Sequence, residues 1–169
     1  GVDAMKRFVS ILLGILLMLG ICSAAKADEL PFTVEGKAFV LMNADSGQAL
    51  FSENADMQTA PDGLTKLMSL LLFMEACEDG RLSLNADVRV SDNAAGMKGT
   101  SAFLDRHETY KAKDLLTAVA VASANDACVA LAEAVYGTEE SFVQNMNARA
   151  KELGLKNTKF VNSTGRSAE

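Results

Sequence analysis

The chain has 169 residues, of which 49% are hydrophobic, and a formal net charge of −6. This length accommodates one modest domain or a piece of a larger one, and the hydrophobic content is that of a chain that forms a core. A nucleic-acid-binding protein is excluded because its surface requires clustered lysine and arginine. The densest basic stretch, residues 106–113, is neutralised by Asp105, Glu108 and Asp114, so we interpret it as a solvated face.

Residues 1–27 have the pattern of a secretory signal peptide behind a short upstream remnant. Lys6 and Arg7 precede an apolar run over residues 8–21, and an Ala-x-Ala sequence ends at Ala27. These three features in this order are typical of a cleaved signal, whereas a membrane-spanning helix needs about 20 apolar residues. We therefore predict export to the cell envelope or periplasm, cleavage after Ala27, and a mature domain over residues 28–169.

The three cysteines bear on anchoring and redox state. Cys22 invites a lipoprotein interpretation, but Ile21 stands where such sites need a small residue, and the predicted cleavage removes Cys22. Cys77 and Cys128 remain, an even number that permits a disulfide in an exported chain. Because each lies on an apolar helical pattern, the sequence favours two separate buried thiols.

The first predicted elements of the mature chain are two strands. Residues 38–43 and 48–53 have strand composition, and Ala44-Asp45-Ser46-Gly47 lies between them as a turn. This arrangement predicts a β-hairpin with a four-residue loop. The polar residues 54–62 follow as a loop.

A helical period begins at Leu64, and Gly80 is a candidate for its C-terminal cap. One apolar stripe recurs at helical spacing, and a second stripe faces the other way, so we expect a helix buried between layers. Lys66 in its first turn is therefore conspicuous, because a charge there either reaches solvent or has a function. The stripes consist of Leu64, Leu67, Met68, Leu71 and Leu72, and of Leu70, Phe73 and Cys77.

Further helices are predicted over residues 112–122 and 126–136, separated by Ser123-Ala124-Asn125. Thr138 is a candidate N-cap for another helix, which Gly154 ends. The apolar stripe of that helix contains Phe142, Met146, Ala150 and Leu153. Residues 160–162 are expected to begin an extended piece, and we expect that the chain is truncated, because two strands alone form a marginal sheet.

Several chemistries are excluded by composition. His107 is the single histidine, which argues against a Ser-His-Asp triad and against zinc sites built on paired histidines. The sequence has no glycine-rich phosphate loop. We therefore expect neither a metal nor a cofactor.

Two motifs remain, and together they resemble the penicillin-binding proteins. The segment from Pro61 to Lys66, Pro-Asp-Gly-Leu-Thr-Lys, resembles the family's Pro-x-Ser-x-x-Lys with Gly63 in place of the serine. Ser123-Ala124-Asn125 resembles the second motif, Ser-x-Asn. The flanking segments SANDACVALAE, FVQNMNARAKELG and NTKFVNSTG resemble the low-molecular-mass D-Ala-D-Ala carboxypeptidases, which are serine peptidases of the S11 family. The resemblance covers residues 37–169.

The chemistry of such a site explains the residue types. A serine at a helix start has its hydroxyl in a positive field, and a lysine three residues later lies within hydrogen-bond reach. If burial lowers the pKa of Lys66, its neutral amine can act as general base. The resemblance implies that Ser123 completes the proton relay and that Asn125 holds the substrate's peptide amide. The plainer alternatives are that Asp62 caps the helix, that Lys66 neutralises Asp62, and that Ser123 and Asn125 are ordinary loop residues.

The resemblance implies a β-lactamase/penicillin-binding fold of the α/β (α+β) class, an antiparallel sheet covered by helices plus a helical subdomain. The implied reaction removes the terminal D-alanine of the peptidoglycan pentapeptide stem through an acyl-serine, and the family is also acylated by β-lactam antibiotics. The family's third element, Lys-Thr-Gly, does not occur in this sequence. We expect it, and any membrane association, in a C-terminal part that the chain does not contain.

Gly63 puts the activity of this chain in doubt. Loss of a catalytic serine costs about 10⁶-fold in kcat in a studied protease, equivalent to about 8 kcal/mol of barrier. We therefore expect an inactive chain. The alternatives are a non-catalytic muropeptide-binding or scaffold protein and a class A β-lactamase, although the Glu-x-x-Leu-Asn deacylation motif is not found.

Overall fold

A computed structural model describes residues 34–166. The chain divides into two compact units, Gly1–Met57 and Gln58–Glu169. The predicted signal peptide over residues 1–27 lies outside the described residues. Within residues 34–166, no helix is both long and apolar enough to span a bilayer.

The first unit contains the predicted hairpin. β1 (Phe39–Met42) pairs antiparallel with β2 (Ala49–Glu53), with a register irregularity between Leu41 and Met42. The turn is closed by the Asn43 N–H, which donates to the Gln48 carbonyl at 2.9 Å, and by the Gly47 N–H, which donates to the Asn43 carbonyl at 2.9 Å. The four-residue loop of the prediction is thus confirmed.

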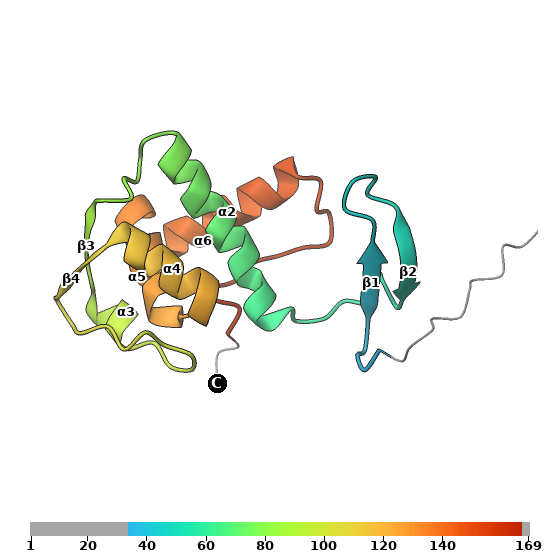
Figure 1. The fold of residues 1–169 in the computed structure, drawn as a ribbon, viewed down its shortest axis with the longest axis horizontal. Helices are drawn as coiled ribbons and strands as arrows, with labels where there is room; N and C mark the ends of the chain where they lie inside the picture. The colour runs from blue at the N-terminus through green and yellow to red at the C-terminus, as the bar shows by residue number, and fades with distance from the viewer. Residues whose placement is uncertain (1–33, 167–169) are drawn as a thin grey trace, which may run out of the picture. The chain divides into compact units, whose positions relative to one another are not determined.

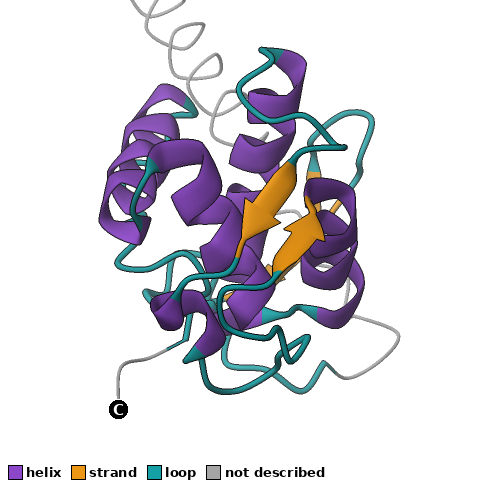
Figure 2. Ribbon diagram, turned by 90° about the vertical axis from the view of Figure 1, so that its left-hand side faces the viewer, coloured by secondary structure: helices purple, strands orange, loops and turns teal. Residues whose placement is uncertain are grey.

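The second unit is mostly helical, with one small two-stranded sheet (Figure 1, Figure 2). β3 (Asp87–Arg89) and β4 (Thr109–Lys111) are antiparallel, and Asp87 lies opposite Lys111. These strands have three residues each. Three residues are too few to show the alternation of apolar and polar residues by which a strand is predicted from sequence. The elements in chain order are η1 (Asp62–Leu64), α2 (Thr65–Glu78), β3 (Asp87–Arg89), α3 (Asp92–Ala95), β4 (Thr109–Lys111), α4 (Ala112–Ala122), α5 (Asn125–Tyr136) and α6 (Glu139–Glu152).

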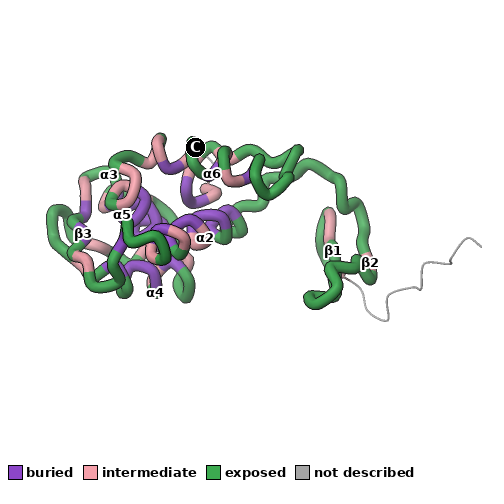
Figure 3. Tube along the Cα trace, turned by 90° about the horizontal axis from the view of Figure 1, so that it is seen from above, coloured by how far each residue is buried: buried purple, intermediate pink, exposed green. Residues whose placement is uncertain are grey.

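The core of this unit is built around α5. This helix packs against α2, α3, α4 and α6, and every residue from 124 to 132 is buried (Figure 3). Phe73 of α2 stacks on Phe142 of α6 with ring centroids 5.0 Å apart, and Tyr136 meets Phe142 edge-on at 5.3 Å. The helices that surround α5 therefore form a close-packed core with it.

The predicted boundaries of the last three helices are confirmed to within one residue. Ser123 ends α4 in the left-handed conformation, with φ of +54°. The Thr138 hydroxyl accepts from the Ser141 N–H at 3.1 Å, so the predicted N-cap of α6 is also confirmed. On the predicted stripe of α6, Phe142 is among the buried residues, but Leu153 is 45% exposed.

The predicted buried stripe of α2 is partly wrong. Leu64 and Leu67 are 66% and 65% exposed, whereas Lys66 and Ser69 are buried. Full burial of α2 between layers is therefore not found in the described part of the chain, where one face packs on the core and the other is exposed. The polar side chains can be buried because carbonyl groups of a distant segment accept their hydrogen bonds, as described below.

The extended piece predicted at residues 160–162 is also wrong, because this segment bends. Asn147 of α6 donates from Nδ2 to the Phe160 carbonyl at 2.8 Å and accepts at Oδ1 from the Phe160 N–H at 2.9 Å. A side-chain amide thus satisfies the backbone groups that a neighbouring strand would otherwise pair. Cys77 and Cys128 are both free thiols, as the helical pattern favoured, but only Cys128 is buried and Cys77 is half-buried.

Candidate active site

Three segments meet at the beginning of α2. They are η1 with the first turn of α2, the junction between α4 and α5, and the turn over residues 162–166, which runs beside α2 (Figure 1). The predicted site residues Gly63, Lys66, Ser123 and Asn125 all lie on the first two of these segments. The turn was not predicted as part of the site.

Gly63 faces Ser123. A Cβ atom built on Gly63 lies 3.8 Å from Ser123 Oγ and meets no other heavy atom within 4 Å. The φ angle of Gly63 lies outside the left-handed region that disfavours other residues. The backbone therefore accepts a side chain here, directed at the Ser123 hydroxyl.

Lys66 is buried, with only 6% of its surface exposed. Its Nζ donates to the Thr164 carbonyl oxygen at 3.1 Å. Burial lowers the pKa of Lys66, and this outweighs the opposite influences of Cys128 and Asp62. Burial also raises the pKa of Cys128 to about 11, so its thiol is protonated and uncharged at neutral pH. Lys66 is thus easier to deprotonate than an exposed lysine, which suits a general base.

The turn over residues 162–166 provides the acceptors for the polar face of α2. The Ser163 carbonyl accepts from Ser69 Oγ at 2.6 Å and from Cys128 Sγ at 3.3 Å. Within the turn, Asn162 Oδ1 accepts from the Thr164 N–H at 3.2 Å and from the Gly165 N–H at 2.7 Å. The Asn-Ser-Thr-Gly sequence is a turn signal, but nothing in it indicates that the turn contacts Lys66.

Gly165 permits the close approach between this turn and η1. Its φ is +80°, and a Cβ atom there would overlap the Asp62 carbonyl oxygen and lie 2.6 Å from Thr65 Oγ1. Only glycine combines this conformation with so little space.

Asn125 is the first residue of α5 and is 5% exposed. Its backbone N–H donates to the Thr100 carbonyl at 2.8 Å, and its Nδ2 donates to the Lys98 carbonyl at 2.9 Å. Its Oδ1 is buried and has no hydrogen-bond partner among the described residues. This oxygen is free to accept a hydrogen bond from a ligand or from a neighbouring donor.

Asp126 anchors the loop that runs past Asn125. Its carboxylate accepts from Ser101 Oγ at 2.6 Å, from the Ala102 N–H at 2.9 Å and from the Leu104 N–H at 3.0 Å. Burial opposes ionisation of this carboxyl, but the hydrogen bonds from Ser101 and from the backbone outweigh it and hold the pKa of Asp126 below its usual value.

The four predicted site residues therefore share one region, but they are not joined into one hydrogen-bond network. Among the described residues, no hydrogen bond connects Lys66 to Ser123 or to Asn125. Lys66 is held by the 162–166 turn, and Asn125 by residues 98–100.

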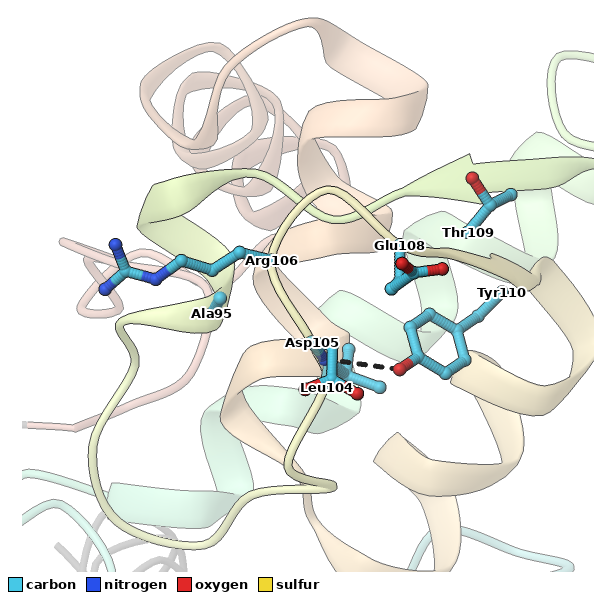
Figure 4. Close-up of a pocket in the computed structure, with 7 residues that line it drawn as sticks. All are labelled: Ala95, Leu104, Asp105, Arg106, Glu108, Thr109 and Tyr110. Carbon is cyan, nitrogen blue, oxygen red and sulfur yellow. Dashed lines mark hydrogen bonds between the residues drawn. The ribbon is translucent and has the colours of Figure 1, made fainter.

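An open hollow elsewhere in this unit contains none of the predicted site residues (Figure 4). The Asp105 N–H donates to Tyr110 Oη at 3.2 Å across it. The charged groups that line the hollow are of both signs and do not converge on one point. We therefore do not consider it the candidate active site. The hollow is lined by Ala95, Leu104, Asp105, Arg106, Glu108, Thr109 and Tyr110.

Solved structures with this architecture define the class of protein. D-alanyl-D-alanine carboxypeptidase DacD from Francisella tularensis superposes with a TM-score of 0.78 at 31% identity, over 83% of this chain and 34% of that one. Penicillin-binding protein 5 from Haemophilus influenzae gives 0.78 at 32% identity, over 82% and 41%. Penicillin-binding protein D2 from Listeria monocytogenes, solved with bound ampicillin, gives 0.73 at 28% identity, over 83% and 56%. The fold is that of the penicillin-binding carboxypeptidases.

Sequence comparison identifies the family. The model of the D-alanyl-D-alanine carboxypeptidase family, peptidase family S11, matches residues 23–169. DacF of Bacillus subtilis is 44% identical over 98% of this chain, and DacC of Escherichia coli is 37% identical over 76% of it. The chain therefore belongs to the serine-type D-alanyl-D-alanine carboxypeptidase family. It spans 44% of the length of DacF and 34% of that of DacC.

Proposed function

We propose that this chain is the N-terminal part of an exported, peptidoglycan-processing D-Ala-D-Ala carboxypeptidase homologue that cannot form an acyl-serine. The observation that carries the proposal is the geometry at Gly63, whose side-chain direction points at Ser123 Oγ, 3.8 Å from the Cβ position. Buried Lys66 follows three residues later. The surroundings of a serine–lysine site are thus present around a residue that has no hydroxyl.

Each remaining site residue has a proposed role. Lys66, whose pKa is lowered by burial, is the general base in a serine-containing form of the site. Ser123 relays the proton to the leaving amine, and Asn125 binds the peptide amide of the substrate. The free Oδ1 of Asn125 supports a binding role, because a buried acceptor without a partner is costly unless a ligand completes it.

The proposed substrate class is the peptidoglycan pentapeptide stem, with β-lactams as mimics in acylating forms. Export is supported by the signal-like pattern over residues 1–27. The family's Lys-Thr-Gly element, which would grip the terminal carboxylate, is not in this sequence. A serine at position 63 is therefore necessary for acylation but not sufficient.

A fluorescent-penicillin gel tests the proposal on four proteins. They are the chain itself, Gly63→Ser, Gly63→Ser joined to the C-terminal portion of DacF, and that same fusion carrying Gly63→Ser with Lys66→Ala. We expect labelling of the Gly63→Ser fusion alone. Glycine offers a backbone N–H but no nucleophile, and loss of Lys66 removes the base.

Labelling of the unmodified chain would overturn the inactive interpretation, and labelling of the short Gly63→Ser form would show that the added portion is dispensable. Thermal unfolding provides the folding control. Gly63→Ser should leave the melting temperature unchanged or raise it slightly, because the backbone at this position has room for the side chain and serine costs less than glycine in helical conformations.

A second candidate, non-catalytic muropeptide binding, is favoured by one specific observation, the unpartnered Asn125 Oδ1. Equilibrium dialysis with a labelled D-Ala-D-Ala peptide tests it on the unmodified chain. Saturable binding that Asn125→Ala abolishes would support this candidate. No binding would exclude it and leave the inactive carboxypeptidase homologue as the only proposal.

A further inference from the structure

One carboxylate oxygen of α6 holds the 162–166 turn. Glu139 Oε1 accepts from the Ser163 backbone N–H at 3.0 Å and from Ser163 Oγ at 2.7 Å. Glu139 is the first residue of α6, and α6 is fixed to the core by the buried Phe142. Because both donors belong to one residue, this carboxylate sets both the backbone and the side chain of Ser163.

The same turn presents its carbonyl groups to α2. The Thr164 carbonyl accepts from Lys66 Nζ at 3.1 Å, and the Ser163 carbonyl accepts from Ser69 Oγ at 2.6 Å. Ser163 and Thr164 are 0% and 2% exposed. The turn therefore lies between Glu139 on one side and the polar face of α2 on the other, and direct hydrogen bonds join it to both.

We propose that Glu139 is a positioning residue for Lys66, because it fixes the Ser163 backbone and so places the Thr164 carbonyl that binds the lysine amine. The inference rests on the proposed function, in which Lys66 is the general base. It adds a residue that neither catalytic motif contains and that acts from a helix distant in sequence.

The chemical consequence concerns the direction of the amine. When the neutral amine donates one N–H to a fixed carbonyl, its lone pair is directed elsewhere, and a base must be oriented in this way to take a proton. The titratable or charged groups around Lys66 are the Cys128 thiol from α5, the Asp62 carboxyl from η1 and, beyond Cys128, the Glu139 carboxylate. Arg166 follows at the end of the turn.

Two conservative substitutions of Glu139 distinguish its positioning of the turn from the electrostatic effect of its negative charge. Glu139→Gln retains the length and an acceptor oxygen but removes the charge, whereas Glu139→Asp retains the charge but shortens the reach. Glu140→Ala is the matched control, because Glu140 lies in the same first turn of α6 and makes none of these contacts. Titration of Lys66 is followed by NMR of isotope-labelled lysine side chains in the full chain, with Lys66→Arg to assign the signal.

We expect Glu139→Asp to shift the Lys66 midpoint to higher pH, because a loosened turn admits water and relieves the burial that is the largest influence on this group. Glu139→Gln and Glu140→Ala should leave the midpoint unchanged. As a second readout, alkylation of Cys128, which donates to the Ser163 carbonyl, should accelerate in Glu139→Asp alone.

A folded Glu139→Asp protein with the original Lys66 midpoint would overturn the inference. So would a shift to lower pH in Glu139→Gln, because loss of a nearby negative charge lowers the pKa of a lysine, and this would indicate a charge effect and not a positioning effect. The titration requires neither a serine at position 63 nor penicillin, so its result is independent of the labelling test of the proposed function.

Discussion

At the scale of single residues, two glycines at the site differ in what surrounds them. Gly63 has room for a side chain, and its nearest neighbour is Ser123 Oγ. Gly165 has no such room, because the Asp62 backbone and the Thr65 hydroxyl occupy the place of its Cβ. The motif resemblance singled out Gly63 as standing in the place of a serine, but nothing in the sequence indicated that Gly165 has no space for a side chain.

We predict that Gly165→Ala destabilises the protein by about 2–5 kcal/mol, which combines left-handed strain with backbone overlap. Urea unfolding followed by circular dichroism measures the loss. Gly154→Ala is the control: Gly154 has a similar φ of +75°, but a Cβ atom added there meets no heavy atom within 4 Å, so its cost should be only about 1 kcal/mol. Equal losses in the two variants would contradict the close approach at Gly165.

At the scale of elements, the loop of residues 98–104 depends on one buried carboxylate. Asp126 accepts from Ser101 Oγ and from two backbone N–H groups of this loop. Its pKa is held below its usual value of 3.8, so the ionised form stabilises the folded state above that pH. This contribution is lost as the pH falls through the lowered folded-state pKa.

We predict that Asp126→Asn lowers the free energy of unfolding at pH 7 by about 2–4 kcal/mol, because an amide cannot accept all of these hydrogen bonds. The difference from wild type should shrink as the pH falls below 3.8. Chemical denaturation at several pH values measures both effects. Asp105→Asn, at an exposed position of the same loop region, should change the free energy of unfolding little at any pH. If Asp126→Asn remained equally destabilised at low pH, the stabilisation could not come from the ionised carboxylate.

The sequence predicted the helices better than it predicted the faces that they bury. The predicted bounds of α4 are confirmed, and α5 begins one residue earlier than predicted, at Asn125, because apolar periodicity is interrupted at Ser123-Ala124-Asn125. The face of α2 was partly wrong because Lys66 and Ser69 are satisfied by carbonyls of Ser163 and Thr164. Local periodicity carries no information on such distant partners. The same reason explains why the motifs identified Lys66 and Ser123 but not Glu139.

At the scale of the whole molecule, the hydrophobic core of the described residues lies entirely in the second unit. Its buried members run from Met68 to Ala150, whereas every residue of β1 and β2 is at least partly exposed. An isolated two-stranded hairpin is marginally stable in water. The two units therefore differ in their capacity to fold alone.

We predict that a chain beginning at residue 58 unfolds cooperatively with helical circular dichroism, and that a peptide of residues 34–57 gives no stable hairpin signal. A chain beginning at residue 74 is the control, because it lacks Met68, Leu72 and Phe73 of the core and should not fold. Non-cooperative melting of the chain that begins at residue 58 would contradict the assignment of the core.

The hydrogen bond from Lys66 to Thr164 joins residues that are 98 positions apart in the sequence. During synthesis, α2 leaves the ribosome long before its acceptors do, so Lys66 and Ser69 remain hydrated until residues 163 and 164 emerge. Closing a loop of this length is entropically costly and slow. The burial that lowers the pKa of Lys66 is therefore complete only once residues 163 and 164 have packed against α2, a step that a nascent chain stalled before residue 163 has not reached.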